Sequence, residues 1–130
     1  MFSHVMVGSN DIEQSRRFYD ALFVALGAKP GRTDDRGRLS YLHKGALFMV
    51  SRPIDGEPAL HGNGSTIGFA LDSREQVHAW HDAGIAAGGK TIEDPPGVRH
   101  GTFGPLYLAY LRDPHGNKLC GLHRLAVDQS

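Results

Sequence analysis

Only a few side chains in this 130-residue sequence combine a reactive type with a position that would hold it in place. His4 lies at the start of the sequence, and Tyr110 and Cys120 lie in apolar segments near its end. A histidine can bind a metal or accept a proton, and a tyrosine hydroxyl can act as a general acid. Each also has an ordinary structural reading: a hydrogen-bonding histidine, a core tyrosine, and a small buried thiol.

The remaining histidines give weaker signals. His78 and His81 are one helical turn apart and could chelate a metal, but Trp80 marks the buried side of that helix and leaves them on the solvated face. His61 and His100 fall in glycine-containing segments that we expect to be loops overhanging a pocket. No G-x-S-x-G, H-E-x-x-H or C-x-x-C motif occurs, so the usual hydrolase, protease and redox motifs are missing.

Composition excludes several classes of partner. The sequence has 14 basic and 14 acidic residues, so no charge asymmetry indicates nucleic acid or an anionic membrane. No apolar run is long enough to span a bilayer, and the N-terminus lacks a signal-peptide pattern. One cysteine excludes an internal disulfide and suits a reducing compartment. We therefore expect a single cytoplasmic domain over residues 1–130.

These residues are positioned by a pattern that occurs twice. The segment from His4 to Lys29 recurs from Thr66 to Lys90, so that Val5 aligns with Ile67. Each copy reads as a short strand, a polar cap and an amphipathic helix that ends in glycine. Two such units packed side by side would place a concave sheet face, and therefore a pocket, on a pseudo-two-fold axis.

The rest of the pattern completes two βαβββ modules of about residues 1–52 and 66–124. Helices are expected from Asn10 or Asp11 to about residue 26 and from Asp72 or Ser73 to about residue 87. Residues 52–65 form the linker. Strands are expected at residues 2–7, 28–32, 39–43, 47–51, 66–71, 90–93, 106–112 and 118–123, with a long Pro/Gly loop from about residue 94. The predicted fold is α+β, a curved eight-stranded mixed sheet around a cleft, with the helices on its outer face.

Two segments carry a family resemblance. The opening HVMVGSNDIEQSRRFYDAL and the closing YLRDPHGNKLC resemble the vicinal oxygen chelate superfamily, which includes glyoxalase I, extradiol dioxygenases and bleomycin-resistance proteins. The most specific pieces are His4 with Asp11, the Phe18-Tyr19 pair, and RDPHGNKL. The resemblance covers essentially the whole chain and implies the paired-module fold and a homodimer. It leaves the reaction open, because this fold hosts lyases, isomerases, dioxygenases and simple binders.

The same resemblance implies where a divalent metal would bind. Its ligands would come from the first and last strands of each module, at positions that match His4, Phe48, Thr66 and Cys120, with Phe48 placed by aligning LFMVS with LCGLH. A catalytic ion needs about three protein ligands. Only His4 is a typical ligand, so the predicted metal site is degenerate unless His61 or His100 completes it.

Two functions remain open. In the first, the chain binds a small organic molecule in the sheet cleft as a glyoxalase-like lyase, isomerase or dioxygenase, with His4 as ligand or base and Tyr110 as proton donor. The residues expected to line the cleft are Phe48, Thr66, Cys120 and His100. In the second, the chain sequesters an aromatic or drug-like molecule without catalysis, which the apolar Phe48 favours. Metal dependence would discriminate between them; a purely structural module is a third reading.

Overall fold

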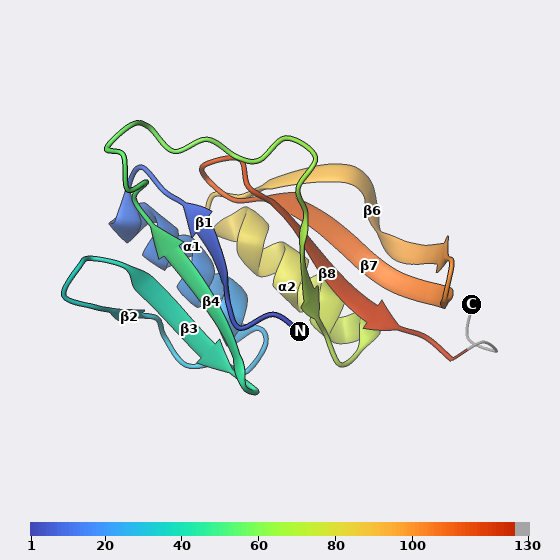
Figure 1. Ribbon diagram of the computed structural model, residues 1–130. Helices are drawn as coiled ribbons and strands as arrows, with labels where there is room; N and C mark the ends of the chain where they lie inside the picture. The colour runs from blue at the N-terminus through green and yellow to red at the C-terminus, as the bar shows by residue number, and fades with distance from the viewer. Residues whose placement is uncertain (127–130) are drawn as a thin grey trace.

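The computed structural model describes residues 1–126 and contains two helices and eight strands (Figure 1). The first module consists of β1 (Val5–Gly8), α1 (Ile12–Val24), β2 (Arg32–Thr33), β3 (Leu39–His43) and β4 (Ala46–Ser51). The second consists of β5 (Ile67–Ala70), α2 (Arg74–Ala86), β6 (Lys90–Gly101), β7 (Gly104–Arg112) and β8 (Lys118–Arg124). No helix within residues 1–126 has the length and apolar character needed to cross a membrane.

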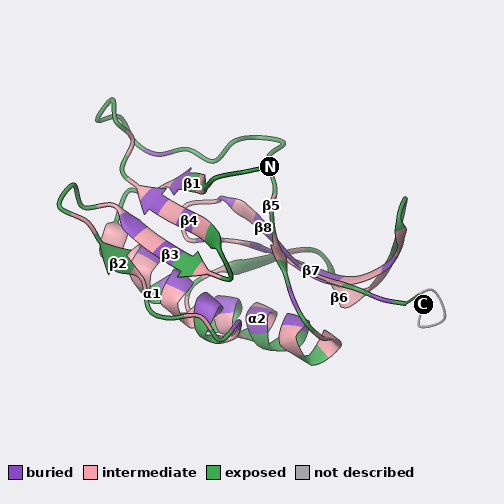
Figure 2. Ribbon diagram, turned by 60° about the horizontal axis from the view of Figure 1, so that its bottom comes forward, coloured by how far each residue is buried: buried purple, intermediate pink, exposed green. Residues whose placement is uncertain are grey.

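The strands form two four-stranded sheets with the same connectivity. Their orders are β1-β4-β3-β2 and β5-β8-β7-β6, and in each sheet the first strand of the module pairs in parallel with the last. Both helices lie side by side on one side of the sheets (Figure 2). The α+β class is therefore confirmed. The expected single eight-stranded sheet is instead two sheets, joined by side-chain packing within the described residues.

The N-cap of each helix is one of the residues predicted for it from the sequence. The Asp11 carboxylate accepts the backbone N–H of Gln14 at 3.1 Å, and the Ser73 hydroxyl accepts that of Gln76 at 3.0 Å. Both caps have extended backbone conformations, as a helix N-cap requires. The two helices thus start at matching points of the repeat and run back along their sheets.

The largest difference from the predicted elements is in β6. The expected loop after Glu93 is a continuation of the strand, which pairs with β7 as far as Gly101. Its register shifts between Ile92 and Gly97, and the Pro95-Pro96 pair falls inside this bulge. Proline is tolerated there because β6 is an edge strand, and a bulge removes the need for ladder N–H groups. His100 therefore lies on a strand, not on a loop over a pocket.

A second difference concerns the register of β4. Val5 of β1 pairs with Phe48, and Ile67 of β5 pairs with Leu119. The residue equivalent to Cys120 is therefore Met49, one position beyond the predicted Phe48. Because successive strand residues face opposite sides of a sheet, this single step turns Phe48 toward the helices. Its ring lies 4.9 Å from that of Tyr19 and 5.7 Å from that of Phe23, both on α1.

The core fills the layer between the helices and the sheets. Phe18 and Trp80, which align in the repeat, are both completely buried. The two helices approach closely at Gly84, where a Cβ would come within 3.2 Å of a Leu22 methyl and 2.3 Å of one of Leu111. Glycine at this position therefore allows α2 to pack against both α1 and β7.

A buried polar cluster, the Asp113 cluster, joins the modules at one end. The Tyr19 hydroxyl of α1 donates to Asp113 Oδ2 at 2.6 Å, and the Asn117 side-chain amide donates to the same oxygen at 2.8 Å. That amide also donates to the carbonyl of Gly8 at 3.2 Å. Asp113 Oδ1 accepts the backbone N–H groups of His115 and Asn117. The turn between β7 and β8 is thus fixed to the first module.

Candidate functional site

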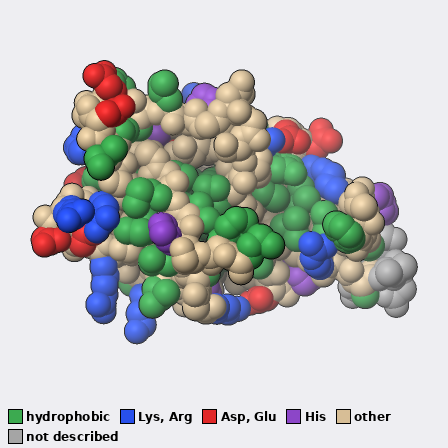
Figure 3. Space-filling view, viewed as in Figure 1, with side chains coloured by type: hydrophobic (Ala, Val, Ile, Leu, Met, Phe, Trp, Pro, Cys, Tyr) green, Lys and Arg blue, Asp and Glu red, His purple; other side chains and the backbone are tan. Residues whose placement is uncertain are grey.

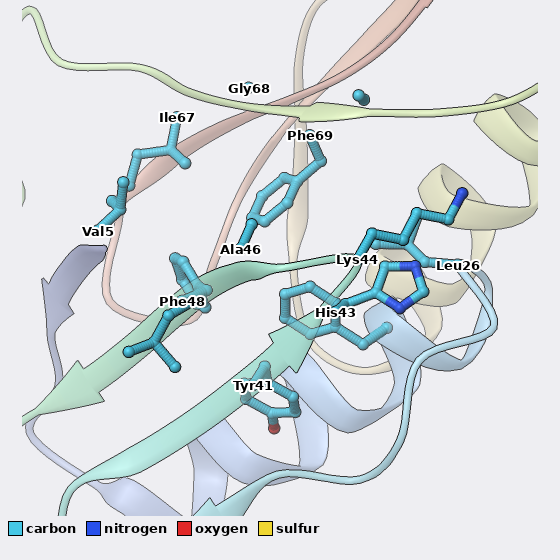
Figure 4. Close-up of a pocket in the computed structure, with 13 residues that line it drawn as sticks. Val5, Leu26, Tyr41, His43, Lys44, Ala46, Phe48, Ile67, Gly68 and Phe69 are labelled. Atoms are coloured by element: carbon cyan, nitrogen blue, oxygen red, sulfur yellow. The ribbon is translucent and has the colours of Figure 1, made fainter. Parts of the chain in front are cut away.

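At the other end of the module junction lies an apolar cavity of about 370 Å³ (Figure 4). It is bounded by β1, β3, β4 and the end of α1 in the first module and by β5 in the second. Most of its wall is aliphatic or aromatic, and no acidic side chain is among the lining residues. These are Val5, Phe23, Leu26, Tyr41, His43, Lys44, Ala46, Leu47, Phe48, Ile67, Gly68, Phe69 and Ala70.

The repeat itself positions the centre of this cavity. Val5 and Ile67, aligned in the two sequence copies, lie near each other at one side (Figure 4). Phe48 and Phe69 form an aromatic wall beside them, with ring centroids 5.5 Å apart in an edge-on arrangement. Phe23 lies 5.5 Å from Phe69 and closes the wall toward α1. Such a surface suits apolar or aromatic groups.

The opposite side of the cavity is formed by the tight β3–β4 hairpin. Lys44 and Gly45 have φ angles of 50° and 80°, as expected for a two-residue turn with left-handed residues. The turn places His43 and Lys44 together, away from Val5 and Ile67 (Figure 4). The Lys44 ammonium lies 3.1 Å from Asp72 Oδ2, and both groups are exposed. The cavity is therefore apolar at one side and polar at the other.

Tyr41 contributes a ring to the wall while its hydroxyl is held outside. The hydroxyl donates to Asp20 Oδ1 at 2.6 Å, and the same oxygen accepts the backbone N–H of Gly31 at 2.9 Å. Burial raises the pKa of Tyr41 strongly, and the hydrogen bond to Asp20 raises it further. The phenol therefore remains protonated, and this part of the wall carries no charge.

The residues predicted from the sequence are dispersed. His4 precedes β1, is exposed, and shares a 2.8 Å hydrogen bond between its Nδ1 and the Ser3 hydroxyl. Thr66 precedes β5 and is exposed, as is His100 near the far end of β6. Of the predicted site residues, Phe48 lines the cavity, and it does so from the core. His4, Thr66 and His100 are not among the lining residues.

Tyr110 and Cys120 are brought together on neighbouring strands. They pair directly across β7 and β8, and the Lys118 ammonium lies 4.8 Å from the Tyr110 ring centroid. Burial raises the pKa of Cys120 to about 11, an effect that a hydrogen bond with Tyr110 partly offsets. Burial also raises the pKa of Tyr110. Both groups are therefore protonated at neutral pH, so the thiol is a poor nucleophile.

Two cations lie near Cys120 in the structure. Lys118 and Arg99 both act to lower the pKa of the thiol, while Glu93, which is ion-paired with Lys118, acts in the opposite direction. Desolvation outweighs these opposing charges, and the net shift is upward. The placement of the charges thus does not activate Cys120.

The donor set does not fit a metal centre of the family type. Phe48 has no donor atom and faces the helices, and Met49 stands at the position equivalent to Cys120. Within residues 1–126, no group of three or more His, Cys, Asp or Glu side chains is arranged to hold an ion. Thr66 offers only a weak hydroxyl ligand.

Sequence reasoning missed most of the residues around the cavity. Leu26, His43, Lys44 and Phe69 were not singled out, because each reads as an ordinary core or turn residue. One signal was present in the repeat: Val5 and Ile67 begin matching strands, and residues at matching places approach a pseudo-two-fold axis.

Comparisons with known proteins agree on the fold. A crystal structure of a glyoxalase/bleomycin resistance protein from Albidiferax ferrireducens T118 is 59% identical, covers 95% of this chain and 99% of its own, and superposes with a TM-score of 0.92. A hypothetical protein from S. aureus is 18% identical, with coverages of 95% and 93% and a TM-score of 0.72; it supports the fold alone. No curated protein matches the sequence.

The family model described as the Glyoxalase/Bleomycin resistance protein/Dioxygenase superfamily matches residues 1–120. This match spans both modules, including the opening and closing segments on which the resemblance rests. The chain belongs to the glyoxalase/bleomycin resistance protein/dioxygenase superfamily.

Proposed function

We propose that this chain binds a small, largely apolar organic molecule in the cavity between its modules, without catalysing its conversion. The observation that carries the proposal is the cavity itself. Its volume of about 370 Å³ falls within the range of about 300–1,000 Å³ typical of small-molecule sites. Its wall combines three aromatic rings of the first module with Phe69 of the second.

The chemistry of the wall supports binding over turnover. Phe48 and Phe69 offer apolar surface, and burying such surface contributes about 25 cal/mol per Å². The Tyr41 phenol is already engaged with Asp20 and is held protonated. Tyr110, the predicted proton donor, and its neighbour Cys120 are not among the lining residues. The proposal therefore corresponds to the sequestration alternative.

The proposal is tested by filling the cavity. Ala46 is exposed and lines the cavity, whereas Ala79 is exposed on α2 and does not line it. In isothermal titration calorimetry with 1-octanol as the probe, we expect Ala46→Trp to weaken binding at least fivefold and Ala79→Trp to leave it unchanged. Binding that is absent in the wild-type protein, or that survives Ala46→Trp unchanged, would overturn the proposal.

A further inference from the structure

A second cavity adjoins the apolar one. Its volume is about 530 Å³, and it lies along the outer side of the β3–β4 hairpin and the segment after α1. Three residues, His43, Lys44 and Leu47, line both cavities, so the two adjoin at the hairpin. A ligand that reaches past these three side chains would enter the second cavity.

The second cavity carries positive charge without acidic side chains in its wall. Lys29, Arg32 and Lys44 line it together with His43, and no Asp or Glu is among the lining residues. Lysine and arginine side chains project from the lower left of the face in Figure 3, below the place of β2 and β3 in Figure 1. The cationic side chains thus gather at the end of the module junction where the apolar cavity lies.

Two of these cations have no charged partner. Within the part of the chain that the structure describes, neither Lys29 nor Arg32 forms an ion pair, and both are exposed. Lys44 is paired with Asp72, which neutralises part of its charge. An anion at this position would therefore gain attraction chiefly from Lys29 and Arg32.

We propose that the ligand is an amphipathic organic anion, whose apolar part enters the apolar cavity while its anionic group lies among Lys29, Arg32 and Lys44. This rests on the proposed function, since it assigns a chemical class to the ligand of the same cavity. The two parts of the ligand match the two surfaces: aromatic rings on one side of the hairpin and unpaired cations on the other.

The electrostatic contribution is modest because the cations are in contact with water. An exposed charge pair contributes little to affinity, and salt screens it further. Three cations around one anionic group therefore raise affinity by about tenfold at low ionic strength over an uncharged ligand of equal length. The apolar cavity supplies the rest of the affinity.

The test compares three probes with the same eight-carbon chain: octanoate, 1-octanol and octyltrimethylammonium, measured by isothermal titration calorimetry in low salt. We expect octanoate to bind about tenfold more tightly than the alcohol, and the cation more weakly than either. The double variant Lys29→Gln/Arg32→Gln should bring octanoate to within about twofold of the alcohol while leaving the alcohol unchanged. The matched control is Arg17→Gln/Lys90→Gln, which removes the same charge at exposed positions outside both cavities.

The outcomes separate this proposal from the proposed function. Equal affinity for octanoate and 1-octanol, or tighter binding of the ammonium probe, would overturn the anionic ligand and leave the apolar cavity in place. The anionic ligand would also be overturned if Lys29→Gln/Arg32→Gln kept the preference for octanoate over 1-octanol. The same holds if the control variant Arg17→Gln/Lys90→Gln lost that preference to the same extent. If no probe binds, both proposals fail together.

Discussion

The two modules differ most at the turn before their last strand, although they share one topology. In the second module, this turn carries Asp113, which is 3% exposed and accepts hydrogen bonds from Tyr19 and Asn117. In the first module, the equivalent turn carries Lys44, whose ion pair with Asp72 is open to solvent. One end of the module junction is therefore held together by buried polar contacts, and the other contains the two cavities proposed to bind the ligand.

This difference separates stability from binding. A buried carboxylate that accepts several hydrogen bonds is costly to disrupt, whereas an exposed ion pair contributes little. The Asp113 cluster can therefore hold the modules together while the hairpin end remains free to accommodate a ligand. The comparison predicts that substitutions at the two ends will differ sharply in their effect on stability.

The largest effect is expected from Asp113→Ala. The substitution leaves the Tyr19 hydroxyl, the Asn117 amide and two backbone N–H groups of the turn without their acceptor. We expect a loss of about 3–5 kcal/mol in the free energy of unfolding, measured by urea denaturation. A loss below about 1 kcal/mol would show that this end does not anchor the modules.

A smaller effect is expected from Tyr19→Phe, which keeps the buried ring but removes its hydroxyl. We expect the free energy of unfolding, measured by urea denaturation, to fall by about 1–3 kcal/mol. The loss is smaller than for Asp113→Ala because the Asp113 carboxylate keeps its other hydrogen-bond donors.

The same variant has a pH signature. Burial and the neighbouring Asp113 raise the pKa of Tyr19 well above its usual value of about 10. The stability that this group contributes is therefore present below about pH 10 and is lost as pH rises further. The Tyr19→Phe variant should show a shallower alkaline loss of stability in urea denaturation at pH 9 to 11. If the wild-type protein and Tyr19→Phe lost stability equally between pH 9 and 11, Tyr19 would not be the source of the alkaline loss.

The smallest effect is expected at the hairpin. Lys44→Gln removes an ion pair whose side chains are 65% and 68% exposed. We expect the free energy of unfolding to change by less than about 0.5 kcal/mol in urea denaturation. If Lys44→Gln lowered the free energy of unfolding as much as Tyr19→Phe, both ends of the module junction would anchor the modules. The contrast between the two ends would then be wrong.

Much of the fold follows from local sequence. Asp11 and Ser73 were both offered as caps because their side chains can accept backbone N–H groups, and both are caps. The strands expected at residues 39–43 and 47–51 are joined by the short turn at Lys44-Gly45. The long β6 was missed because a proline pair argues against a strand unless the strand is at an edge and bulged.

The candidate site was less predictable, because it depends on register and on contacts between distant residues. Aligning LFMVS with LCGLH placed Phe48 one residue out of register, and one residue exchanges the two faces of a sheet. The resemblance singled out Tyr19 and Asp113 in separate segments. Only the three-dimensional structure shows that their side chains form a hydrogen bond that joins the two modules.

The parallel pairing of β1 with β4 has a consequence for how the chain acquires its structure. The partner of β1 follows it only after α1, β2 and β3, whereas β3 and β4 are adjacent in sequence, as are β6, β7 and β8. Contacts between distant segments form more slowly than local ones. We therefore expect the hairpins to form first and the opening strand of each module to dock last. During synthesis, β1 would leave the ribosome before β4 and would remain unpaired until β4 is available.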